Sequence, residues 1–129
     1  MNKIFLDMDG TLARFNVRNA LERFENEKGF FANLLAYKGI ENINEMVKNG
    51  NVYIISASPN MYADMDKKTW LKKYIPNLKN KNILLCRNGQ NKAKFIENKL
   101  GILNNVNVET EILIYSVRFK LLILDKILY

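Results

Sequence analysis

Two acids separated by one residue, Asp7 and Asp9, follow an apolar run near the start of the chain and precede Gly10 and Thr11. Paired carboxylates can divide catalytic work, one ionised as a nucleophile and one protonated as an acid, where their surroundings separate their pKa values. An aspartate can attack phosphorus to give an aspartyl-phosphate, and carboxylate oxygens suit Mg²⁺. An ordinary turn is the alternative, because Asp, Gly and Thr are common in loops. No alternating partner strand follows Thr11 to support a hairpin.

A hydroxyl and an ammonium group occupy comparable places further along the chain. Ser56 follows the apolar run Val52–Ile55, and Lys92 opens an amphipathic segment after the run Ile83–Cys86. If these runs are adjacent parallel strands, the two acids, Ser56 and Lys92 meet at the carboxyl edge of the sheet, where such sheets bind ligands. Hydroxyl and ammonium groups stabilise the equatorial oxygens of a transferring phosphoryl group. The chain has no histidine, so proton transfer near neutral pH must use carboxylates, Lys, Tyr or water.

The elements that must position these groups follow from the hydrophobic pattern. Continuous apolar runs are typical of strands buried on both faces of a parallel sheet, and they occur at Ile4–Leu6, Val52–Ile55 and Ile83–Cys86. Apolar residues at helical spacing predict four helices, at about 17–24, 40–47, 62–74 and 93–100. The order favours a parallel α/β sheet with right-handed crossovers. A fourth strand at 112–114 is an option, but a second apolar run at 121–124 follows almost at once.

Length and composition limit the remaining possibilities. At 129 residues the chain predicts one domain, and no apolar stretch reaches the ~20 residues of a membrane span. We expect no signal peptide, and the lone Cys86 fits a reducing cytosol, so a cytoplasmic location is expected. The net charge of +7 comes from scattered lysines, which indicate solvated helix faces and disfavour a nucleic-acid partner. These are Lys67, Lys68, Lys72, Lys73, Lys79, Lys81, Lys92, Lys94 and Lys99.

Several of these stretches resemble one family. The run Asp7-Met8-Asp9-Gly10-Thr11 resembles motif I (D-x-D-G-T) of the haloacid dehalogenase (HAD) superfamily of phosphohydrolases, with Ser56 and Lys92 matching its motif II hydroxyl and motif III lysine. Further stretches are similar to the 5'(3')-deoxyribonucleotidases, at 29–34, 58–59, 67–71 and 88–92. The resemblance covers residues 1 to about 103. It implies a Rossmann-like α/β fold in a single domain over 1–129. Its core would be 1–12 and 51–129, with a small helical C1-type cap at about 13–50 and an atypical, incomplete tail at about 104–129.

The resemblance also implies an activity. Asp7 would be the nucleophile, and Asp9 would protonate the leaving ribose oxygen and then activate water. Both would hold Mg²⁺. The implied reaction is Mg²⁺-dependent removal of phosphate from (deoxy)ribonucleoside monophosphates through an aspartyl-phosphate. The partner is then a small nucleoside monophosphate, with no membrane, and a homodimer is one option for the assembly.

Phosphate and base contacts are implied in the same way. Ser56, Lys92, Gly10 and Thr11 would bind phosphate. Phe30 and Phe31 would wall an apolar slot for the nucleobase, since a flat ring suits an aromatic surface, or would instead pack a cap against the core. Trp70 is expected in the core.

One departure from the family concerns the metal. The family has a fourth strand ending in one or two aspartates that complete the Mg²⁺ shell, whereas this chain reads Ile-Leu-Ile-Tyr-Ser at 112–116, and the nearest later acid after an apolar run is Asp125. Three explanations stay open: a truncated or frameshifted product, which the biased tail favours, a pseudoenzyme, or a site in which Asp125 serves. The corresponding alternatives for function are an inactive nucleotide-binding remnant and a phosphatase acting on a sugar phosphate or other small ester.

Overall fold

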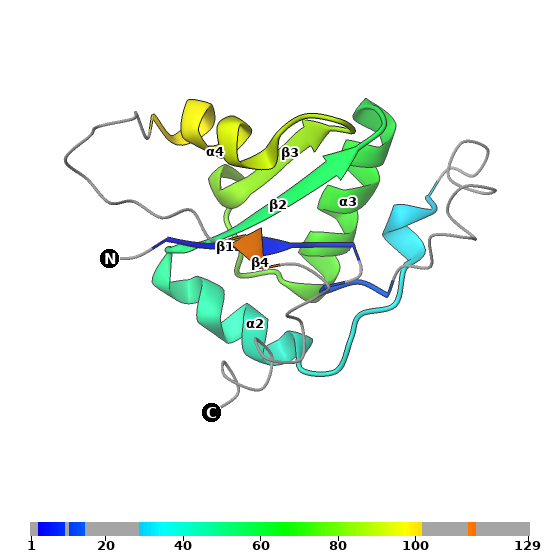
Figure 1. The fold of residues 1–129 in the computed structure, drawn as a ribbon. Helices are drawn as coiled ribbons and strands as arrows, with labels where there is room; N and C mark the ends of the chain where they lie inside the picture. The colour runs from blue at the N-terminus through cyan, green and yellow to red at the C-terminus, as the bar shows by residue number, and fades with distance from the viewer. Residues whose placement is uncertain (1–2, 10, 15–28, 102–113, 116–129) are drawn as a thin grey trace.

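A parallel sheet with strand order β3-β2-β1-β4 forms the centre of the molecule (Figure 1). The computed structural model describes residues 3–9, 11–14, 29–101 and 114–115. The strands are β1 (Ile4–Asp7), β2 (Val52–Ser58), β3 (Ile83–Arg87) and β4 (Ile114–Tyr115). All three pairings are parallel. The predicted α/β class is therefore confirmed.

Helices cover both faces of this sheet. They are α2 (Ile40–Met46), α3 (Met61–Tyr74) and α4 (Lys92–Leu100), with short 3-10 helices η1 (Phe31–Asn33), η2 (Val47–Asn49) and η3 (Asn80–Asn82). The hydrophobic core divides into two clusters, one with residues of α2 and α3 and one with residues of α4. Figure 1 shows α4 on the opposite side of the strands from α2.

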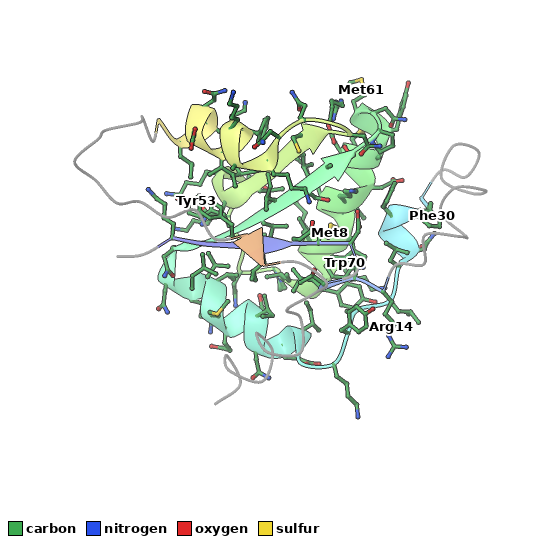
Figure 2. The ribbon with its side chains drawn as sticks, in the orientation of Figure 1. Met8, Arg14, Phe30, Tyr53, Met61 and Trp70 are labelled. Atoms are coloured by element: carbon green, nitrogen blue, oxygen red, sulfur yellow. The ribbon has the colours of Figure 1, made fainter. Side chains whose placement is uncertain are left out.

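Alternation along the strands explains the two clusters. Leu6 and Ile54 pack on the face that holds Trp70, while an adjacent residue in each strand, Phe5 and Ile55, packs on the α4 face. Trp70 is fully buried in the first cluster with Met8 (Figure 2), and its Nε1 donates a hydrogen bond of 2.7 Å to the carbonyl oxygen of residue 34. The expectation that Trp70 belongs to the core is confirmed.

The helices begin and end where the sequence provides caps. The Asn60 side chain accepts a hydrogen bond from the backbone N–H of Ala63 at 2.9 Å, and Asn91 does the same for Lys94 at 3.0 Å. Gly101 ends α4 at a φ of 65°, a left-handed conformation that favours glycine. The Asn91 cap makes Lys92 the first residue of α4, which fixes the direction of its side chain.

The bounds of β2 and β4 differ from the sequence-based expectation. β2 does not end at Ile55 but continues to Ser58, because β3 pairs alongside it as far as the Ser58–Arg87 register position. The fourth strand is found at Ile114–Tyr115, beside Phe5 and Leu6 of β1. The expected helix at 17–24 and the apolar run at 121–124 lie outside the described residues. None of the helices in the described ranges has the length and apolar character needed to span a membrane.

Candidate active site

The first acid and the predicted phosphate-binding lysine are in contact. Asp7 is the last residue of β1 and Lys92 the first of α4. Lys92 Nζ donates to Asp7 Oδ1 at 3.0 Å across a separation of 85 residues, and the backbone N–H of Met8 donates to the same oxygen at 3.0 Å. Both side chains are partly buried, with 15% of Asp7 and 29% of Lys92 exposed. This screening from water strengthens the pair relative to one on the surface.

The loop after β1 is folded tightly around one carbonyl. The backbone N–H groups of Thr11, Leu12 and Ala13 donate to the Met8 carbonyl oxygen at 3.2, 2.9 and 3.0 Å. Asp9 lies inside this turn. Its Oδ1 and the hydroxyl of the buried Thr11 are both buried polar atoms with no hydrogen-bond partner among the described residues. Gly10, the other predicted phosphate contact in this loop, lies outside the described residues.

Lys67, which was expected on a solvated helix face, occupies the centre of the site instead. Lys67 is fully buried. Its Nζ donates to Asp9 Oδ2 at 2.7 Å, to Ser56 Oγ at 2.8 Å and to the Ala57 carbonyl at 2.7 Å. All three ammonium protons are therefore engaged. The solvated-face prediction is wrong for Lys67.

Helical spacing carried the signal for this burial. Lys67 stands four residues after Ala63 and three and four residues before Trp70 and Leu71, all of which are buried. Residues at these spacings share one face of a helix. A lysine on an otherwise buried face must pair with an anion, because an unpaired buried charge is very costly. Asp9 is that anion.

Burial and charge act in opposite directions on Asp9. Its pKa is raised above the ordinary value chiefly because burial disfavours the charged carboxylate. The charge and hydrogen bond of Lys67 lower the pKa, the neighbouring charge of Asp7 raises it, and Lys92 lowers it slightly. The net direction increases the protonated fraction of Asp9, which suits a group that must donate a proton.

The two predicted base-binding aromatics lie on the α3 side of this site. Phe31 is buried, and its ring centroid lies 4.4 Å from Lys67 Nζ, within cation–π range. The Phe30 ring, which is half-buried, packs edge-on against Phe31 with centroids 5.1 Å apart. The N–H of Gly29 donates to Asp66 Oδ2 of α3 at 2.9 Å, which ties this segment to the helix.

The donor set fits Mg²⁺ in part. Within the described ranges no cluster of three His, Cys, Asp or Glu could hold a metal. Mg²⁺, however, is commonly held by one or two carboxylates together with substrate phosphate and water. Asp7, Asp9 and the unpartnered Oδ1 of Asp9 match that pattern. Asp125, the candidate third acid, lies outside the described residues.

The sequence of the chain matches the model of one protein family. Residues 10–98, more than half of the chain, match the model of the family described as 5' nucleotidase, deoxy (pyrimidine), cytosolic type C protein. The matched range includes Ser56, Lys67 and Lys92, and Asp7 and Asp9 immediately precede it. A search of curated proteins finds no match.

Proposed function

Since the chain belongs to the family of cytosolic type C deoxy (pyrimidine) 5' nucleotidases, we propose that it is a phosphomonoesterase that removes phosphate from deoxyribonucleoside and ribonucleoside monophosphates with Mg²⁺. The observation that carries the proposal is the pairing of two acids with two lysines at the carboxyl end of β1, Asp7 with Lys92 at 3.0 Å and Asp9 with Lys67 at 2.7 Å. The family description and the lone Cys86 support action in the cytosol.

The first step forms an aspartyl-phosphate. Oδ1 of Asp7 accepts from both Lys92 and the Met8 N–H, so we assign the attack on phosphorus to Oδ2. A bond forms between this oxygen and phosphorus while the phosphorus–ribose oxygen bond breaks. Asp9 donates its proton to the leaving ribose oxygen, which is released as a hydroxyl group. The raised pKa of Asp9 supports this role.

The second step hydrolyses the intermediate. Asp9, now ionised, takes a proton from water, and the resulting hydroxide attacks phosphorus. The bond between phosphorus and Asp7 breaks, releasing inorganic phosphate and the free carboxylate. Asp9 regains its proton, so the site returns to its starting state.

Neighbouring groups bind the phosphate. Ser56 Oγ accepts a hydrogen bond from Lys67, so its own O–H is directed elsewhere and can donate to a phosphate oxygen. Lys92 supplies positive charge beside Asp7. The unpartnered Thr11 hydroxyl and the Gly10 backbone N–H would complete the phosphate contacts.

Different residues would contact the nucleobase and the metal ion. Phe30, half-buried beside Phe31, would contact the nucleobase. Asp7 and Asp9 would hold Mg²⁺, which supplies neutralising charge for the phosphoryl group when bound. Lys67 acts as a positioning residue, since its bond to Asp9 Oδ2 holds the carboxyl group in place and leaves Oδ1 without a hydrogen-bond partner among the described residues.

Phosphate release from dUMP and dTMP in the presence of Mg²⁺ tests the proposal. We expect turnover that disappears in Asp7→Asn and persists in the control Glu41→Gln, which changes an exposed acid of α2. No release from any mononucleotide or sugar phosphate would refute it.

The second candidate is an inactive nucleotide-binding remnant, favoured by the lack of a three-acid cluster within the described ranges. It predicts thermal stabilisation by dTMP without turnover. A comparison of dTMP with a sugar phosphate in the same assay separates a nucleotidase from a phosphatase of other small esters.

A further inference from the structure

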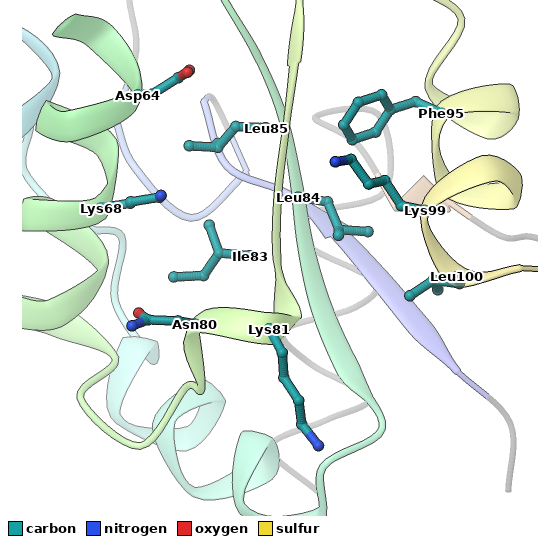
Figure 3. Close-up of a pocket in the computed structure, with 10 residues that line it drawn as sticks. All are labelled: Asp64, Lys68, Asn80, Lys81, Ile83, Leu84, Leu85, Phe95, Lys99 and Leu100. Carbon is teal, nitrogen blue, oxygen red and sulfur yellow. The ribbon is translucent and has the colours of Figure 1, made fainter. Parts of the chain in front are cut away.

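A cavity of about 330 Å³ runs along β3 (Figure 3), and none of the four paired acids and lysines is among the described residues that line it. β3 is an edge strand of the described sheet, so its outer side has no neighbouring strand in that part of the chain. We call this cavity the edge groove. Its floor is Ile83–Leu85, with Lys68 of α3 on one side and Phe95 and Lys99 of α4 on the other.

The edge groove has the shape that an extended peptide requires. In a parallel strand, alternate backbone N–H and C=O groups point away from the paired neighbour and are open to a new strand. Figure 3 shows Ile83 and Leu85 directed toward α3 and Leu84 directed toward α4. An added strand would therefore place alternate side chains in an α3 half and an α4 half of the groove, both with apolar surface.

The charge of the groove determines what kind of segment fits. Its lining includes three exposed lysines, Lys68, Lys81 and Lys99. The acid in the same lining is Asp64, whose carboxylate is already bound by Arg87 at 2.8 and 3.0 Å. The groove thus presents uncompensated positive charge around an apolar floor. A second copy of this chain would bring the same lysines against it, which disfavours self-pairing.

We propose that the edge groove docks an extended segment of a partner protein in which a few apolar residues are flanked by aspartate or glutamate. The backbone of the segment would pair with β3, its apolar side chains would contact Leu84, Leu85 and Phe95, and its acids would pair with the lysines at the rim. This interaction is independent of the proposed phosphatase activity.

Binding of a synthetic peptide to the full chain tests the proposal. The probe is fluorescein-labelled Asp-Glu-Val-Ile-Val-Glu-Asp, measured by anisotropy at low and high salt. We expect saturable binding that weakens with salt and falls at least tenfold in Lys68→Glu/Lys99→Glu. The charge-matched control Lys3→Glu/Lys38→Glu alters two exposed lysines outside the groove and should leave binding within twofold.

Two altered peptides separate strand addition from simple charge attraction. N-methylation of the central Val-Ile-Val backbone should weaken binding at least tenfold because it removes the donors that pair with β3. A peptide with lysine in place of each acid should not bind. Equal binding of the N-methylated peptide, or equal loss in the groove and control variants, would overturn the proposal. Sedimentation provides a further test. If the chain self-associates and Lys68→Glu/Lys99→Glu alters that self-association, the proposal is also overturned, because the occupant of the groove would then be a second copy of the chain.

Discussion

Replacing Lys67 with methionine tests the central feature of the site, a fully buried lysine that holds Asp9 and Ser56. Methionine keeps the length and most of the apolar stem of lysine but removes its charge and its three hydrogen bonds. The variant therefore separates packing from electrostatics. Lys68→Met is the matched control, because Lys68 is the next residue of the same helix and is exposed.

The expected cost follows from the partner left behind. Removing one member of a buried ion pair typically costs about 3–5 kcal/mol, because the other charge stays buried without compensation. Asp9 keeps 17% of its side chain exposed, so water and protonation reduce this penalty. Methionine also regains contact with the Phe31 ring, 4.4 Å from the lysine nitrogen. We therefore expect a loss of about 2–4 kcal/mol, against less than about 0.5 kcal/mol for Lys68→Met.

Urea unfolding followed by the fluorescence of Trp70 measures both free energies. The double variant Lys67→Met/Asp9→Asn provides the sharper test. If the damage in Lys67→Met is an uncompensated carboxylate, neutralising Asp9 should restore about 1–3 kcal/mol. A double variant less stable than Lys67→Met, or a Lys67→Met cost no larger than that of Lys68→Met, would refute the assignment of this pair.

Two further predictions concern the rest of the fold. Asn60→Ala should lower the free energy of unfolding by about 1 kcal/mol, because it removes the cap on the Ala63 N–H; urea unfolding measures this, and an unchanged midpoint would contradict it. Cys86 is a buried free cysteine, and burial raises its thiol pKa, so an aromatic disulfide reagent should react with it only on unfolding. Because the folded pKa lies above the unfolded one, the thiol's contribution to stability is present below the unfolded pKa and is lost as pH rises above about 8.5. The stability difference between wild type and Cys86→Ala should therefore narrow at alkaline pH, and a widening difference would contradict the sign.

The sheet could be predicted from the sequence because each inner strand is a continuous apolar run, a pattern that depends only on burial of both faces. The end of β2 could not. Ser56, Ala57 and Ser58 have the composition of a loop, yet they continue the strand because Cys86 and Arg87 of β3 lie beside them. Strand length here depends on a neighbour about 30 residues away, and local composition carries no information about that neighbour.

Some residues of the candidate site could likewise be predicted from the sequence, and one could not. Asp7 and Lys92 could be predicted to lie together because Asp7 ends a strand and Lys92 opens the helix after another strand, and parallel strands bring such positions to the same edge of the sheet. The prediction of a solvated position for Lys67 is wrong because it rests on the usual exposure of lysine, whereas Lys67 lies on the face of α3 that buries Ala63 and Trp70. A search for an anion that could pair with a lysine on a buried helical face would identify Lys67 as a candidate site residue.

Charge balance gives a physical reason to expect that the proposed site requires a divalent cation for its substrate. When Asp9 has given up its proton, both acids are ionised, and Asp7 and Asp9 then balance Lys67 and Lys92 in the two ion pairs. A phosphate dianion entering this partly buried site would leave two uncompensated negative charges, and their desolvation opposes binding. A divalent cation restores the balance.

Inorganic phosphate should therefore bind at least tenfold more tightly in the presence of Mg²⁺ than in its absence. Linkage requires the same factor for Mg²⁺ affinity with and without phosphate. Calorimetric titration of the full chain measures both affinities without relying on turnover. Lys92→Met should weaken phosphate binding in both conditions, because it removes the cation beside Asp7. A phosphate affinity that does not depend on Mg²⁺ would contradict the charge-balance argument. It would show that the two acids and two lysines do not have zero net charge when phosphate binds.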